Sequence, residues 1–112
     1  PSAASDVYKR QPSTRKLMDH LDLSIDEFDV IEINEAFAAQ VLAVIREFGL
    51  EDSAEHVNRN GGAISLGHPL GASGARLVGT AARMLSEGGC KRALCTMCIG
   101  VGQGIAVALD AA

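Results

Sequence analysis

The sequence predicts a mixed α/β domain in which helices pack on a small sheet. The chain has 112 residues, which fits one domain of ordinary size. Hydrophobic residues make up 47% and charged residues 21%, a balance that favours a folded core over disorder. Segments of helical and strand periodicity alternate along the chain, and such alternation is typical of layered α/β domains.

The first half of the chain is expected to form a helix, a strand and a second helix. Ser13 or Thr14 can cap a short helix that ends near Asp22. Its apolar side is formed by Leu17, Met18 and Leu21. Residues 29–33 are rich in β-branched side chains and predict a strand. Residues 36–48 carry an apolar stripe at helical spacing, and Gly49 is placed to end that helix.

The second half is expected to form a turn-rich loop, a helix and two strands. A polar connection at 51–56 leads to a glycine-rich loop at 58–69. Residues 70–87 follow as a helix that stops at Gly88 and Gly89. Residues 92–97 and 105–109 predict strands, and the glycine loop between them is short enough for antiparallel pairing.

Charge and composition exclude several classes of function. Ten Lys and Arg against fourteen Asp and Glu give a net charge of −4, and the longest basic run is Lys9-Arg10, so we expect no nucleic-acid partner. The longest apolar stretch, 36–45, is well short of the roughly 18 residues that indicate a membrane span. The three cysteines form an odd, crowded set that suits a reducing compartment, and we expect a cytoplasmic protein.

Three loops at strand or helix ends carry polar or reactive residues among small ones, at 34–37, 61–74 and 98–104. His68 stands between Gly67 and Pro69, just before a predicted helix. The free N–H groups and the dipole of a helix N-terminus favour a neutral imidazole, which can act as a base. A histidine that only caps or packs is the alternative. Asn34 could likewise be a helix N-cap or a buried amide that holds a water.

The cysteines do not form a convincing redox or zinc motif. Cys95 and Cys98 are three apart on a strand, so their side chains project to opposite faces. No second Cys pair is present to complete a zinc site. Cys98, at the end of the strand, is the cysteine placed to meet a substrate, whereas Cys95 suits a buried core. Arg76 and Arg83 are interpreted as a solvated helix face without a role in a site.

Glycine patterns exclude two common enzyme classes. Gly100, Gly102 and Gly104 form G-x-G-x-G, which lacks the spacing and the following helix of a dinucleotide site. The segment Gly71–Gly74 is followed by Ala75, so it is not a nucleophile elbow of serine hydrolases. Glycines after a cysteine can instead present backbone N–H groups to a developing oxyanion.

Taken together, three segments resemble the C-terminal signatures of the thiolase family. They are N-E-A-F-A at 34–38, N-G-G-A-I-S-L-G-H-P-L-G-A-S-G-A-R at 60–76 and C-I-G-V-G-Q-G at 98–104. The resemblance runs from about Ser13 to Leu109. It implies a thiolase-like layered mixed sheet, the C-terminal half of an αβαβα fold.

The resemblance also implies acyl transfer between coenzyme A thioesters, by Claisen condensation or by thiolysis of a 3-oxoacyl-CoA. His68 matches the histidine that activates a nucleophilic thiol, and Cys98 matches the cysteine that exchanges a proton with the second thioester. Asn34 matches the asparagine whose water joins the histidine in an oxyanion hole. Gly100 would donate its N–H in a second oxyanion hole. Phe37 matches a position near the pantetheine arm.

The departures from the family pattern set a limit on this expectation. In thiolases the nucleophilic cysteine lies in the first half of a longer chain, and none of the three cysteines here matches it. We therefore expect residues 13–112 to be a C-terminal domain without its N-terminal partner half, and residues 1–12 to be a disordered leader or an assembly scar. As an isolated fragment the chain is expected to be inactive. The alternative is a non-catalytic thiolase-like module that binds acyl-CoA or lipid.

Further expectations follow from the family resemblance. CoA and acyl-CoA would be substrates, without a permanently bound cofactor, and the enzyme would be a homodimer or homotetramer. The segment C-T-M-C-I-G-V-G-Q-G, at 95–104, is similar to the 3-oxoadipyl-CoA thiolase branch.

Overall fold

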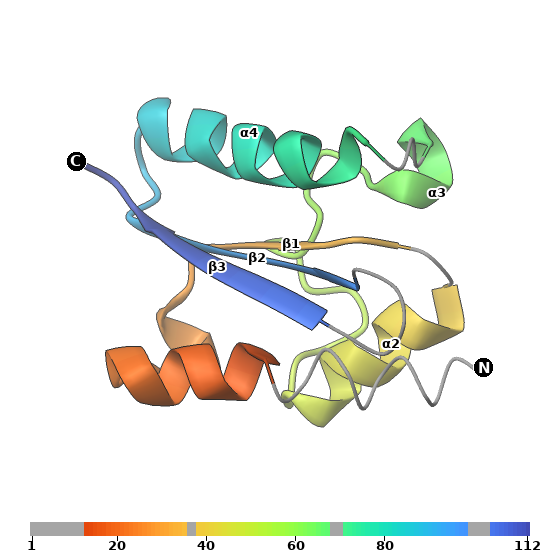
Figure 1. Ribbon diagram of the computed structural model, residues 1–112, viewed down its shortest axis with the longest axis horizontal. Helices are drawn as coiled ribbons and strands as arrows, with labels where there is room; N and C mark the ends of the chain where they lie inside the picture. The colour runs from red at the N-terminus through yellow and green to blue at the C-terminus, as the bar shows by residue number, and fades with distance from the viewer. Residues whose placement is uncertain (1–12, 36–37, 68–70, 99–103) are drawn as a thin grey trace.

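A three-stranded sheet lies between two layers of helices in the computed structural model, which describes residues 13–35, 38–67, 71–98 and 104–112 (Figure 1). A helix over residues 13–21 is followed by the short 3₁₀ helix η1 (Ile25–Glu27). The remaining elements, in chain order, are β1 (Val30–Ile33), α2 (Ala38–Glu47), α3 (Ala63–Leu66), α4 (Ser73–Ser86), β2 (Arg92–Cys98) and β3 (Gly104–Asp110). The predicted α/β class is therefore confirmed.

The strands pair in the order β1-β2-β3. β1 runs parallel to β2, with Ile33 opposite Thr96. β2 and β3 are antiparallel, with Cys98 opposite Gly104, as the short loop between them predicts. The parallel pair places the carboxyl ends of β1 and β2 at the same edge of the sheet.

Side-chain alternation along β1 divides the interior into two clusters, one on each face of the sheet. Ile31 and Ile33 face the helix over 13–21 and α2, which lie together on one side in Figure 1. Val30 faces α4 on the other side. α4 contributes its buried stripe of Leu77, Ala81 and Leu85 to this second cluster. Each helix layer thus covers its own face of β1 and of the central part of β2, where the sheet is buried on both sides.

Left-handed residues end the helix over 13–21 and α2. Gly49 has φ of 76°, and the Leu50 N–H donates to the Ile45 carbonyl at 3.0 Å, which confirms the predicted stop. Asp22 adopts φ of 56° after the helix over 13–21, and the Leu23 N–H donates to Met18 at 2.9 Å. This turn directs Leu23 into the core. The expectation that Leu21 lies on the apolar side is wrong, since its side chain is 43% exposed.

The loop region before α4 differs from the sequence-based expectation. The predicted polar connection leads into a parallel bridge between Val57 and Ile31. The predicted loop at 58–69 contains one helical turn, α3, stabilised where the Gly62 N–H donates to the Ser65 hydroxyl at 3.2 Å. α4 begins at Ser73 rather than at residue 70, which lies outside the described residues.

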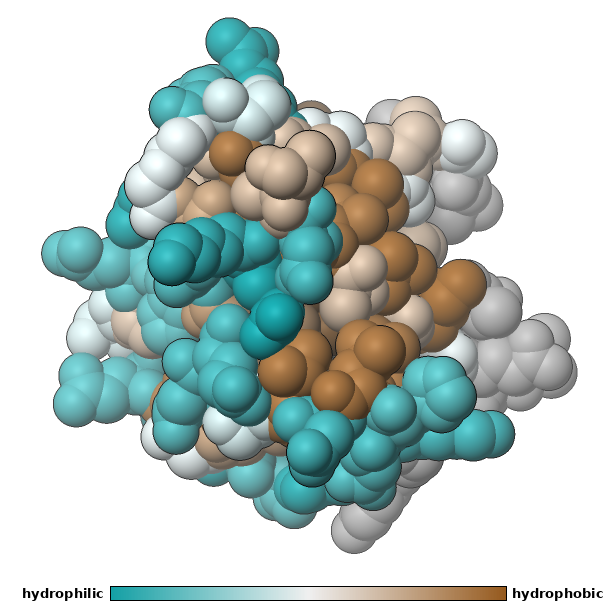
Figure 2. Space-filling view, turned by 90° about the vertical axis from the view of Figure 1, so that its left-hand side faces the viewer, coloured by the Kyte–Doolittle hydropathy of each residue, from teal (hydrophilic) through white to brown (hydrophobic). Residues whose placement is uncertain are grey.

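β3 is an edge strand of the described sheet and is only partly covered. Most of its side chains have intermediate exposure, and Ile105 is 44% exposed. A band of apolar side chains crosses the face of the molecule shown in Figure 2. Apolar surface of this kind is typical of regions that contact further protein. Within the described residues, no helix is both long and apolar enough to cross a membrane.

Leu94 tests the two-layer core, because its side chain on the central strand is only 1% exposed. Leu94→Ala is expected to lower the free energy of unfolding by about 2–5 kcal/mol, since it removes buried methyl groups and leaves a cavity. Leu21→Ala, at an exposed position, is the control and should change it by less than about 1 kcal/mol. Urea unfolding followed by circular dichroism measures both. Equal effects of the two substitutions would contradict the assigned core.

Candidate active site

The parallel pairing of β1 and β2 brings two of the signature segments together. Asn34 follows β1 directly, and its backbone N–H donates to the Thr96 carbonyl on β2 at 3.0 Å. Cys98 is the last residue of β2, two residues beyond Thr96. The edge of an α/β sheet beyond the carboxyl ends of its strands is a common place for a reactive site.

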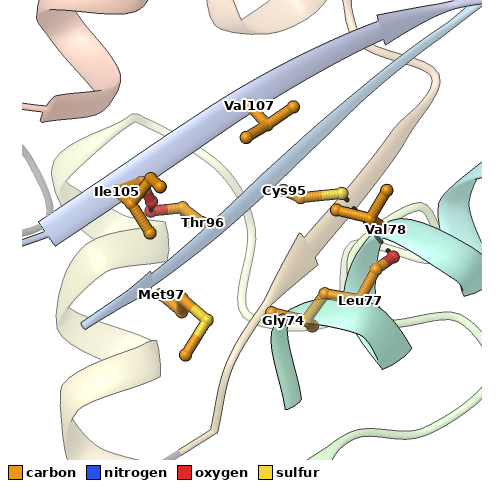
Figure 3. Close-up of a pocket in the computed structure, with 8 residues that line it drawn as sticks. All are labelled: Gly74, Leu77, Val78, Cys95, Thr96, Met97, Ile105 and Val107. Carbon is orange, nitrogen blue, oxygen red and sulfur yellow. Dashed lines mark hydrogen bonds between the residues drawn. The ribbon is translucent and has the colours of Figure 1, made fainter. Parts of the chain in front are cut away.

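The third segment reaches the same edge through the start of α4. Gly74, in the first turn of α4, and Met97, next to Cys98, line a common pocket of about 240 Å³ (Figure 3). Its lining, which comes from α4, β2 and β3, consists of Gly74, Leu77, Val78, Cys95, Thr96, Met97, Ile105 and Val107. This lining contains no charged side chain. The pocket is therefore an apolar recess between α4, β2 and β3.

Among the predicted site residues, Asn34 is one whose side chain the structure describes. Asn34 is buried, with 1% exposure. The predicted sites at Phe37, His68 and Gly100 lie outside the described residues. The backbone of Cys98 ends β2, and its side chain is not among those described. The structure thus brings Asn34 and the backbone of Cys98 to one edge, with the start of α4 beside them.

Cys95 is a core residue, as the sequence predicts. It is 4% exposed, and its thiol donates to the Leu77 carbonyl on α4 over 3.6 Å (Figure 3). Burial, with a smaller contribution from the nearby Glu32 carboxylate, raises the pKa of the Cys95 thiol to about 12. A thiol with so high a pKa is a poor nucleophile at neutral pH.

Asn58 extends the edge of β1 with its side chain. Its Oδ1 accepts from the Ile33 N–H at 2.8 Å, and its Nδ2 donates to the Ile33 carbonyl at 2.9 Å. The amide of Asn58 therefore makes the two bonds that a neighbouring strand would make, immediately before Asn34. Its φ of 49° is a conformation that Asn tolerates better than most residues.

Glu35 connects this end of β1 to the glycine-rich loop. One carboxylate oxygen accepts from Asn58 Nδ2 at 3.1 Å, and the other accepts from the Ile64 N–H at 3.2 Å. Sequence reasoning missed both Glu35 and Asn58 as site residues. An acidic residue beside Asn34 and an isolated Asn before the glycines are the signals that could have drawn attention to them.

Sequence reasoning also missed Glu32 and Arg76, two residues of opposite charge that interact electrostatically. Glu32 on β1 has no exposed surface, and its carboxylate oxygens find no hydrogen-bond partner among the described residues. Burial raises its pKa from near 4.5 to about 7; the Arg76 cation opposes this shift and Glu35 adds to it. The interpretation of Arg76 as a solvated residue is wrong, because its Nε and Nη2 are buried in the fold. Arg83 is exposed and pairs with Glu87 at 3.0 Å.

The described residues contain no group of three or more His, Cys, Asp or Glu side chains that could hold a metal ion. The polar groups at this edge are instead amides and carboxylates bonded to the backbone. Such an arrangement can orient loops and stabilise a charge that develops nearby.

A layered α/β domain with a buried amide, that of Asn34, at the carboxyl end of its first strand defines the general class of this protein. The family model of the thiolase C-terminal domain matches residues 5–111, and the chain belongs to the thiolase family. The resemblance predicted from its three signatures is therefore confirmed.

Relatives and solved structures agree with this assignment. The chain is 64% identical over 99 residues to beta-ketoadipyl-CoA thiolase of Pseudomonas knackmussii, which covers 88% of this chain and 25% of the relative. It is 49% identical over 100 residues to acetyl-CoA acetyltransferase of Syntrophomonas wolfei, with 89% and 25% covered. Human mitochondrial 3-ketoacyl-CoA thiolase superposes with a TM-score of 0.87 and 41% identity, over 96% of this chain and 27% of that one. The chain spans about a quarter of the length of the curated relatives that it matches.

Glu32→Gln tests the buried carboxyl. Because the pKa of Glu32 is raised in the folded state, its contribution to stability is complete below about pH 4.5 and is lost as the pH rises through about 7. The neutral amide of Gln has no such dependence. The free energy of unfolding of the variant, relative to the unsubstituted protein, should therefore rise by up to about 3 kcal/mol between pH 4.5 and pH 8.

Urea unfolding at both pH values measures this difference, and it cancels the contributions of the other carboxyl groups. Glu87→Gln is the matched control, since Glu87 lies in an exposed ion pair. A difference that stays constant with pH for Glu32→Gln would show that this carboxyl titrates normally.

Proposed function

We propose that this chain is the C-terminal part of a thiolase that transfers acyl groups between coenzyme A thioesters, by reversible Claisen condensation or thiolysis of a 3-oxoacyl-CoA. The observation that carries the proposal is the meeting of three thiolase signatures at one sheet edge. Asn34 bonds to β2 two residues before Cys98, and α4, which follows the G-H-P segment, begins beside Met97.

We assign the chemical roles as follows. His68 activates the thiol that takes up the acyl group, a thiol that lies in the other half of thiolases. Cys98 exchanges a proton with the α-carbon of the second thioester. Asn34 holds a water that, with His68, binds the thioester oxygen, and Gly100 donates its N–H to a second oxyanion hole. Phe37 contacts the pantetheine arm of CoA.

The burial of Asn34 supports its assigned role. A buried amide with a fixed backbone cannot turn away into solvent, so a water that it holds keeps its position during the reaction. Fixed dipoles of this kind stabilise a developing negative charge without reorganising.

The substrate that we favour is 3-oxoadipyl-CoA. Its support is the 64% identity to a beta-ketoadipyl-CoA thiolase, compared with 49% to an acetyl-CoA acetyltransferase over nearly the same length. Within the segment at 95–104, which is similar to the same branch, Cys95–Cys98 form the end of β2 at the candidate site.

We also propose that the enzyme acts in the cytoplasm as a homodimer or homotetramer. The bacterial relatives support the compartment, and the incompletely covered apolar side chains of β3 leave surface for contact with further protein. A non-catalytic module that binds acyl-CoA or lipid is the competing function. The joint presence of Asn34, His68 and Cys98 favours the enzyme, since binding alone has no use for a base.

A chimaera tests the function directly. The chain would replace the matching segment of the Pseudomonas knackmussii relative, which supplies the remaining three quarters of a thiolase. We expect the chimaera to cleave 3-oxoadipyl-CoA in a CoA-dependent reaction, with a higher kcat/KM than for acetoacetyl-CoA. The loss of the 3-oxoacyl-CoA absorbance measures both rates. The 112-residue chain alone should give no turnover, because it has no acyl-accepting thiol.

A folded chimaera that binds acyl-CoA but cleaves neither substrate would support the binding module instead. Preference for acetoacetyl-CoA would contradict the substrate assignment while leaving the reaction class intact.

Cys98→Ser in the same chimaera tests the base. A serine hydroxyl is far less acidic than a thiol, so condensation should fall by about 10²–10⁴-fold. Acylation by labelled acetyl-CoA should stay within a few-fold of the unsubstituted chimaera, because it uses a different thiol. Thr96→Ser is a nearby control on the same strand. Unimpaired condensation in Cys98→Ser would rule out the assigned role.

A further inference from the structure

Glu35 is bonded on both sides by residues that belong to different parts of the fold. Asn58, which donates to one carboxylate oxygen at 3.1 Å, is itself fixed to the backbone of Ile33. Ile64, which donates to the other oxygen at 3.2 Å, lies in the first turn of α3. The carboxylate thus joins the end of β1 to the loop that follows Asn58.

The Ile64 N–H is a donor that the helix itself does not satisfy. The first N–H groups of any helix have no acceptor within the helix, and a carboxylate bound to one of them forms a charge-assisted hydrogen bond. α3 is only four residues long, so this bond acts on nearly the whole turn. Glu35 therefore fixes the orientation of α3 relative to β1.

Gly62 shows how closely the loop lies on this carboxylate. A Cβ placed on Gly62 would collide with Oε1 and Cδ of Glu35. The backbone of the loop thus rests directly against the Glu35 side chain, and a side chain at this position would displace one of them.

α3 leads straight to the G-H-P segment. Its last residue is Leu66, and the Gly67 N–H donates back to the Ala63 carbonyl at 2.8 Å. His68 follows Gly67 in the sequence. One closed helical turn therefore separates the Ile64 N–H, which Glu35 binds, from His68, the residue that is proposed to activate the thiol.

We propose that Glu35 and Asn58 are positioning residues for this reaction: together they fix the loop that carries His68 against the strand end that carries Asn34. The inference rests on the proposed function. Asn34 and Glu35 are adjacent in the sequence, so one dipeptide both supplies the buried amide and fixes the orientation of the loop. Neither Glu35 nor Asn58 need touch the reacting atoms.

The test uses the active chimaera described above. Glu35→Ala removes both acceptors, and kcat for thiolysis should fall by about 100-fold, the effect expected when a reacting group is displaced by about 1 Å. KM for CoA should change by less than about 2-fold, because this loop is assigned to the chemistry and not to CoA binding. Hydrogen exchange of the peptide over 59–67 should become faster.

Conservative variants separate positioning from a general loss of structure. Glu35→Gln keeps one acceptor oxygen and turns its NH₂ group toward the second donor, so it should recover about 10-fold of the lost kcat. Asn58→Asp keeps the acceptor for the Ile33 N–H but places a carboxylate against Glu35, so it should resemble Glu35→Ala. Val44→Ala is the matched control, since Val44 on α2 is 1% exposed and belongs to the hydrophobic core rather than to the loop. It should lower Tm while leaving kcat per titratable active-site thiol unchanged.

The outcomes distinguish the two proposals. Normal kcat in Glu35→Ala, or a loss in proportion to Tm that Val44→Ala reproduces, would overturn the positioning role and leave the thiolase assignment standing. A rise in KM for CoA with normal kcat would also overturn it. An unsubstituted chimaera without thiolysis would count against the proposed function, and the positioning role would fall with it.

Discussion

The pairing of β1 with β2 is the constraint on which the rest of this structure depends. Both strands are buried on both faces, and their parallel register places residue 34 beside the end of β2. The bond from the Asn34 N–H to the Thr96 carbonyl continues the ladder one residue past β1. If this register shifted by one residue, every side chain on β1 would change faces, and Asn34 would leave the candidate site.

The two carboxyl groups near the end of β1, those of Glu35 and Glu32, differ in burial and in their hydrogen-bond partners. Glu35 is partly buried and has a donor for each oxygen, whereas Glu32 is fully buried and relies on the more distant cation of Arg76. A buried carboxylate without hydrogen bonds is unfavourable when ionised, which is why the pKa of Glu32 lies near 7 while its site remains in the core. The two acidic residues thus have separate physical roles. Glu35 orients a loop, and Glu32 contributes to the charge balance of the interior.

Local patterns predicted those parts of the fold that depend on local forces. The β-branched residues at 29–33 correctly predicted β1, and the apolar segment at 92–97 correctly predicted β2. Gly49 correctly marked the end of α2. α3 could not be predicted, because a single turn is too short to show a period. The interaction of Arg76 with Glu32 joins residues distant in the sequence, and the pairing of Asn58 with Ile33 replaces a backbone contact by a side chain. Neither relation leaves a local signal. The signatures predicted the family, while the roles of His68, Cys98, Gly100 and Phe37 stay predictions.

The register of the sheet also has a consequence for the order of folding. β2 and β3 form a hairpin whose innermost pair is Cys98 and Gly104, so their ends meet after closing only a short loop. β1 joins β2 across a much longer separation, since Asp29 and Arg92 are 63 positions apart where the two strands begin. Contacts between distant segments carry the larger entropic barrier and form late. Closing the β2–β3 hairpin therefore costs less chain entropy than docking β1, and the candidate site, where Asn34 bonds to Thr96 on β2, depends on the more costly of the two contacts.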